Sequence, residues 1–194
     1  MRNLLFAGVA MVLAPLLHFQ PVAGTGVAVQ PPANEAVIVS GFQRGVQSYV
    51  ELHRSLEGPV PTIAVSEDWQ RVRAAIDALA IQIRAARKDA RRGDIFTPDV
   101  ERWFRRTIAT LLRDCDIAEL LASLNEENPE GLVLLPRVNG SWPEEASLGP
   151  MPPLLLGGLP PLPDELQYRF MNRDLVLWDA HANIIVDFIT HVMP

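Results

Sequence analysis

The chain has 194 residues, of which 48% are hydrophobic and 21% are charged, and it is long enough for one domain with a sizeable core. Its formal net charge of −6 argues against nucleic acid as a partner, because surfaces that bind nucleic acid are basic. A single cysteine excludes an intramolecular disulfide.

The N-terminal residues have the pattern of an export signal. Met1-Arg2-Asn3 gives a short positive start, and the apolar run Leu4–Leu17 is shorter than the about 20 residues that span a bilayer. Small residues up to Ala28 predict cleavage there; cleavage after Ala23 and an uncleaved anchor helix are the alternatives. We therefore predict a signal peptide over residues 1–28 and a periplasmic or secreted location.

A helical region is predicted over residues 37–127, after a Pro-containing linker over 29–36. Gly58-Pro59 should end the first helix. His53 lies on the apolar face of this helix, where we expect a partly buried histidine with satisfied hydrogen bonds rather than a ligand. The positions at helical spacing are Val39, Phe42, Val46, Tyr49, Val50, His53 and Leu56.

The second helix is predicted to begin at Ser66 as the N-cap, with Glu67 and Asp68 in its first turn. Gly93 stands where a glycine just beyond the C-terminal end is expected. The apolar stripe between these signals consists of Trp69, Val72, Ile76, Leu79, Ile83 and Ala86.

The third helix is predicted to start at Thr97, with Pro98 in its first position. Its buried face should include Val100, Phe104 and Ile108. After Arg113–Asp116, the apolar residues either continue this helix or start a short fourth one.

Residues 128–165 form a Pro-rich connection that we expect to pack across the domain surface rather than to bind a Pro-recognising partner. Within it, Leu132–Leu135 could form a short strand, and Asn139-Gly140 is a strong turn signal. Pro153–Leu156 could form one helical turn.

The last residues, 166–194, predict a three-stranded antiparallel β-unit packed against the helices. Asn172-Arg173 is a tight turn in which asparagine accepts positive φ. Together with the helical region, this β-unit predicts an α+β fold in which residues 37–194 form one domain. The predicted strands are Leu166–Met171, with Tyr168 and Phe170 on one side; Leu175–Trp178, apolar on both faces; and Ile184–Ile189, with Ile184, Val186 and Phe188 on one face.

Three stretches, "GDIFTP", "VNGSWP" and "LPPLPDELQYRFMNRDLVLWDAHANIIVDFI", resemble a group of exported bacterial proteins of unknown function. The last stretch also resembles the end of the RcnB-like periplasmic proteins associated with nickel and cobalt homeostasis. The shared pattern is a Pro-rich lead-in, an aromatic strand, an apolar strand ending in Asp, and an I-V-D strand. This chain departs from it in having Asn183 where glycine is usual, and in its helical N-terminal half.

No catalytic or nucleotide-binding motif is present in the sequence. A divalent transition-metal ion is a possible cofactor, because imidazole and carboxylate ligands bind nickel, cobalt, copper and zinc. The candidate ligands are His181, Asp179, Asp187 and His191. In the alternative interpretation, Asp179 caps a turn through its own backbone and His181 is exposed.

Three functions remain open from the sequence. The leading hypothesis is a non-catalytic envelope protein that binds an unknown protein or envelope component, and it predicts no cleft of converging polar groups. The second is a periplasmic metal-handling protein. The third is a hydrolase without a recognisable motif, which predicts a buried carboxylate or histidine with a shifted pKa in a pocket. The arginines of 84–92 and 102–113 could face an anionic partner, but helix dipoles and solubility account for them as well.

Overall fold

The computed structural model describes residues 33–57, 69–126, 128–129, 132, 134–149 and 151–193. The predicted signal peptide and its cleavage site lie outside these residues. So do Gly58-Pro59, the predicted N-cap Ser66 and the acidic first-turn residues Glu67 and Asp68. Among the described residues, no helix is long and apolar enough to cross a membrane.

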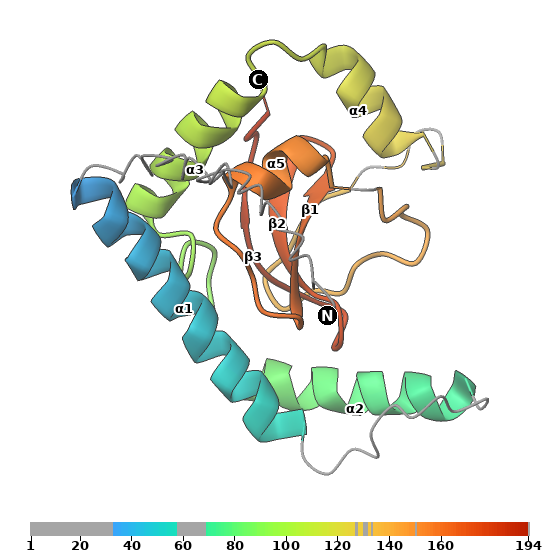
Figure 1. Ribbon diagram of the computed structural model, residues 1–194. Coiled ribbons are helices and arrows are strands. Elements are labelled where there is room, and N and C mark those ends of the chain that lie inside the picture. Colours follow the sequence, from blue (N-terminus) through green and yellow to red (C-terminus); the bar gives the residue numbers. More distant parts are fainter. Residues whose placement is uncertain are drawn as a thin grey trace, which may run out of the picture. The chain divides into compact units, whose positions relative to one another are not determined.

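The chain has an α+β fold with an N-terminal helical layer and a C-terminal antiparallel sheet (Figure 1). Helix α1 (Ala33–Glu57) begins four residues before the predicted start at 37, so residues 33–36 belong to the helix rather than to the linker. Its buried side chains keep the predicted spacing: Phe42, Val46, Tyr49, Val50 and His53.

Helix α2 (Trp69–Ala86) packs against α1, but it is buried only in its C-terminal half. Leu79, Ala80 and Ile83 are buried there, whereas Trp69 is 67% exposed. Among the described residues, the predicted apolar stripe is therefore buried toward its C-terminal end, with Val72 and Ile76 half-buried between.

Helix α3 (Pro98–Leu111) has Thr97 as its N-cap, and Val100, Phe104 and Ile108 are buried as predicted. The chain then breaks, and a separate helix α4 spans Ile117–Asn125. The carboxylate of Asp116 accepts the backbone N–H groups of Ala118 and Glu119, so side-chain capping starts the new helix.

The Pro-rich connection contains helix α5 (Pro153–Gly158), which extends the predicted turn. The described residues of Leu132–Leu135 are not in a strand, so that prediction is wrong. Asn139 has a φ of 62° in the predicted turn. This turn is held in place by Ile185, with which Asn139 and Gly140 exchange backbone hydrogen bonds of 2.8 Å.

Strands β1 (Leu166–Met171), β2 (Asp174–Asp179) and β3 (Ile184–Ile189) pair antiparallel in that order. Asn172 and Asn183 have φ values of 56° and 50° in the two turns, a conformation that asparagine tolerates. β2 is the central strand and is covered on both faces, as its apolar sequence predicts.

One face of the sheet packs against the helices, with Tyr168, Phe170 and Leu177 among the contacting residues. The other face is covered by the Pro-rich connection, from which Trp142 packs near Trp178 at 5.8 Å between ring centroids. The connection therefore packs across the sheet, as predicted.

A β-bulge in β3 changes which side chains face the helices. Leu177 lies opposite Asp187, but Trp178 lies opposite Ile185, so Val186 is an extra residue. Val186 and Asp187 both point toward the helical layer, while Phe188 packs on the other face. The prediction that Phe188 shares a face with Ile184 and Val186 is therefore wrong.

Candidate functional site

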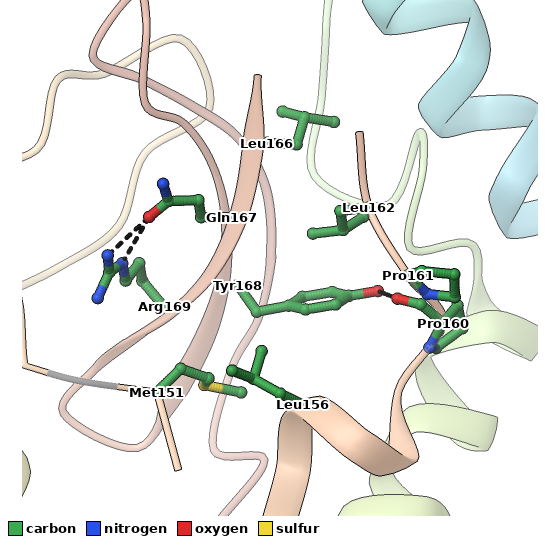
Figure 2. A pocket seen from close by; sticks show the side chains of 9 residues that line it. All are labelled: Met151, Leu156, Pro160, Pro161, Leu162, Leu166, Gln167, Tyr168 and Arg169. Atoms are coloured by element: carbon green, nitrogen blue, oxygen red, sulfur yellow. Dashed lines mark hydrogen bonds between the residues drawn. The ribbon is translucent and has the colours of Figure 1, made fainter. Parts of the chain in front are cut away.

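An apolar pocket of about 420 Å³ lies between α5 and strand β1 (Figure 2). Its polar side chains are paired with neighbouring groups. Tyr168 donates its hydroxyl hydrogen to the Pro160 carbonyl at 3.0 Å, and Arg169 donates to Gln167 Oε1 at 2.6 and 3.2 Å. The pocket therefore offers apolar surface, but its Tyr, Arg and Gln groups do not converge on a common point.

Asp187, one of the four residues predicted as metal ligands, instead anchors the loop that follows α2. Its buried carboxylate accepts backbone N–H groups from Gly93, Ile95, Phe96 and Phe188 at 2.8–2.9 Å. Gly93, with a φ of 93°, belongs to this loop and does not directly follow the end of α2 at Ala86. The oxygens of Asp187 are fully used by these contacts.

His191, another predicted ligand, is exposed beyond the end of β3. Its backbone N–H donates to Asp174 Oδ1, and its carbonyl accepts from Arg105. His181 precedes β3, so the length of this strand separates the two histidines, roughly 20 Å at about 3.3 Å per residue. The structure therefore does not bring the four predicted residues together.

Asp179 lies at the end of β2, fully buried between the sheet and α1. Its Oδ2 accepts the Tyr49 hydroxyl at 2.6 Å and lies 2.7 Å from His53 Nδ1. Its Oδ1 accepts the backbone N–H groups of His181 and Ala182, which is the turn cap of the alternative interpretation. Burial alone would raise the pKa of Asp179, but the hydrogen bonds from His53, Tyr49 and Ala182 lower it below its ordinary value.

His53 is fully buried on α1, and its two ring nitrogens have different surroundings. Nδ1 is bound to Asp179, whereas Nε2 has no hydrogen-bond partner among the described residues. Burial opposes the charged imidazolium, but the hydrogen bond and charge of Asp179, together with the charges of Glu57 and Glu165, raise the pKa of His53 overall. The prediction of a satisfied histidine is therefore correct for Nδ1 and wrong for Nε2.

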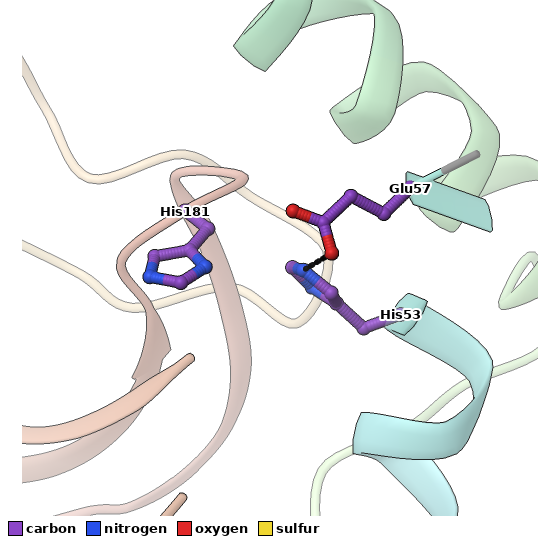
Figure 3. A group of neighbouring side chains, drawn as sticks. All are labelled: His53, Glu57 and His181. Atoms are coloured by element: carbon purple, nitrogen blue, oxygen red, sulfur yellow. Dashed lines mark ion pairs between the residues drawn. The ribbon is translucent and has the colours of Figure 1, made fainter. Parts of the chain in front are cut away.

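Nε2 of His53 lies beside two further ligand groups, which we call the His53 cluster: His53, Glu57 and His181 (Figure 3). One ligand atom from each of the three lies within 4.8 Å of the others. Nε2 is 3.9 Å from Glu57 Oε2, and the two imidazole rings are 5.9 Å apart between centroids. Glu57 is 44% exposed and His181 is exposed, so the cluster opens to solvent on one side.

The chemistry of the His53 cluster fits a divalent transition metal. Two imidazoles and one carboxylate form a donor set that zinc, nickel and cobalt accept. The hydrogen bond from Nδ1 to Asp179 would hold the ring with the Nε2 lone pair toward the ion, as a carboxylate often does for a histidine that binds a metal. Asp179 is itself held by Tyr49 and by the backbone of the turn between β2 and β3.

Asp179 and His181 were among the ligands predicted from the sequence, but His53 and Glu57 were not. Their spacing of four residues on one helix was an available signal, because residues i and i+4 lie on the same face. The apolar surroundings of His53 on that face pointed instead to a structural histidine.

Two further pockets lie elsewhere on the described residues, one beside Arg87 and Asp94 and one beside Trp103 and Arg106. Neither of them, nor the apolar pocket, is lined by His53, Glu57 or His181. Comparison with protein-family models, with curated proteins and with solved structures finds no match to this chain.

Proposed function

We propose that this protein binds a divalent transition-metal ion of the zinc, nickel and cobalt class at His53, Glu57 and His181. The observation that carries the proposal is the buried Nε2 of His53, which has no hydrogen-bond partner among the described residues and faces a carboxylate and a second imidazole. A buried nitrogen without a partner is costly, and a bound ion would satisfy it.

This proposal keeps the metal-handling hypothesis from the sequence but changes its ligands. Asp179 moves from ligand to the group that orients His53, and Glu57 and His53 replace Asp187 and His191. The converging groups support metal binding ahead of a purely non-catalytic interaction protein, which predicts no such convergence. Export and the resemblance to RcnB-like proteins stay predictions.

The test is calorimetric titration and thermal unfolding of the purified protein with zinc, nickel and cobalt. We expect one ion per chain, and at about 100-fold over the dissociation constant the metal should add about 2.7 kcal/mol to the free energy of unfolding. His181→Ala and Glu57→Gln remove partly exposed ligands with little effect on the fold, and each should weaken binding at least tenfold.

The matched control is His191→Asn. It removes an exposed histidine of the same chain, and asparagine suits the φ of 47° at this position. Metal binding should be unchanged in this variant. Binding that is lost in His191→Asn but kept in His181→Ala would contradict the proposal, as would the absence of binding with all three metals.

A further inference from the structure

Among the described residues, two buried side-chain atoms have no hydrogen-bond partner: Nε2 of His53 and Oε2 of Glu165. Glu165 lies outside the His53 cluster, immediately before β1, and its side chain is only 8% exposed. Buried carboxylate oxygens are nearly always satisfied by protein, water or an ion, so this second atom also needs a physical account.

The contacts of Glu165 place it beside the cluster. Its Oε1 accepts from Arg54 Nε at 2.6 Å, and Arg54 follows His53 on α1. Its carbonyl accepts the backbone N–H of Ala180 at 2.9 Å, and Ala180 lies between Asp179 and His181. Glu165 is therefore held from both sides by the two segments that carry the cluster.

The charges agree with this placement. Burial would raise the pKa of Glu165, but the hydrogen bond and charge of Arg54, with a contribution from His53, lower it. Glu165 is thus a carboxylate with Oε1 bound by Arg54 and with Oε2 buried and without a hydrogen-bond partner among the described residues.

The position of Glu165 next to segments that carry the cluster fits an indirect contact with an ion bound there. Glu165 is not among the residues whose ligand atoms lie within 4.8 Å of one another. Nitrogen and oxygen ligands bound directly to one zinc or cobalt ion lie about 2.0–2.2 Å from it, and the ligand atoms are therefore close to one another. A metal-bound water reaches further, because a hydrogen bond of about 2.7 Å adds to the metal–oxygen distance.

We propose that Glu165 is a positioning residue that accepts a hydrogen bond, through Oε2, from a water molecule in the fourth coordination position of the metal at His53, Glu57 and His181. This inference rests on the proposed metal binding. A metal with three protein ligands and a water has one coordination position at which the water can be exchanged, whereas structural sites have four protein ligands. The site would therefore be of the open, exchangeable kind.

The test uses the cobalt-loaded protein and azide, a small anion that competes with water for an open position. The carboxylate of Glu165 retains the water and repels an anion. In Glu165→Gln we therefore expect azide to bind about tenfold more tightly, as measured by the change in visible cobalt absorption, with cobalt still bound. Substitution of a residue that contacts the ligands of a metal commonly costs about 10–100-fold in metal affinity, so cobalt is kept in excess.

The matched control is Glu101→Gln, which removes another partly buried Glu–Arg pair, with Arg105 on α3. Its azide affinity should equal that of the wild type. An unchanged azide affinity in Glu165→Gln would overturn the inference, and so would a loss of cobalt binding as severe as in His181→Ala, which would make Glu165 a direct ligand.

A crystal structure of the cobalt-loaded wild type tests the same point without any variant. We expect a solvent oxygen between the metal and Oε2 of Glu165. A direct bond from Glu165 to cobalt, or an Oε2 that faces elsewhere, would overturn the inference. If the wild type binds no metal at all, the proposed function itself fails, so the two failures are distinguishable.

Discussion

At the scale of single residues, Asp179 joins the sheet to α1. It is buried and ionised, and it accepts hydrogen bonds from Tyr49 and His53 on the helix and from two N–H groups of its own turn. These bonds replace the hydration that the carboxylate loses on folding. Removing one member of such a pair leaves a buried polar group without its partner.

Asp179→Asn should therefore lower the free energy of unfolding by about 3 kcal/mol near neutral pH, in the presence of a chelator. The measurement is urea denaturation of both proteins over a range of pH. The size of the loss should depend on pH, because two groups with shifted pKa values contribute to it.

The direction of the pH dependence follows from the pKa shift of each group. The pKa of Asp179 is lowered on folding, so its contribution is present above the unfolded value of about 3.9 and is lost as pH falls through the folded value. The pKa of His53 is raised, so its contribution is complete below about 6.5 and is lost as pH rises through the folded value. The difference between wild type and Asp179→Asn should be largest between about pH 4 and 6.5; a difference that does not vary with pH would contradict this account.

At the scale of elements, the loop between α2 and α3 is held by β3 rather than by its own helices. Gly93, Ile95 and Phe96 donate their N–H groups to Asp187, which the β-bulge at Val186 turns toward the helical layer. The loop can present these groups because Gly93 adopts a φ of 93°, which L-residues with a side chain rarely adopt.

Gly93→Ala should cost about 1–2 kcal/mol in the free energy of unfolding, because alanine is strained in the left-handed region. Gly157→Ala is the matched control, since a Cβ there meets nothing within 4 Å. At this exposed helical position alanine should be neutral or stabilising by up to about 1 kcal/mol. If the two substitutions have equal effects on the free energy of unfolding, a Cβ at position 93 causes no strain and this account is wrong.

At the scale of the whole molecule, three short strands are stable because both faces of the sheet are covered. The helices bury one face, and the Pro-rich connection buries the other with Trp142, whose indole N–H donates to the Ala146 carbonyl at 3.2 Å. The proline-rich sequence therefore contributes a second hydrophobic layer and not only a link between helices and strands.

Trp142→Ala should lower the free energy of unfolding by about 3–5 kcal/mol, as for other large buried aromatic residues. Leu135→Ala, in the same connection but 78% exposed, should change it by less than about 0.5 kcal/mol. Circular dichroism and fluorescence should follow one common transition in both variants. A loss below 1 kcal/mol for Trp142→Ala would mean that this layer does not stabilise the sheet.

The sequence by itself determined much of the local structure: the apolar faces of α1 and α3, the asparagine turns and the three strands. It left open whether a break precedes α4. These features depend on helical or alternating periodicity and on turn chemistry, which act over a few residues. The sequence also pointed to Asp179 and His181 as neighbours in one turn.

Only the tertiary structure decided what that turn faces. His53 and Asp179 are 126 residues apart, and no local pattern indicates that α1 crosses the end of β2. The bulge at Val186 likewise cannot be predicted from an alternating pattern. It turns Asp187 toward the loop before α3, while His191 lies beyond the far end of the strand. Which ligand groups meet depends on long-range packing and strand register, and so His53, Glu57 and Glu165 emerged only when the helix and the sheet were placed together.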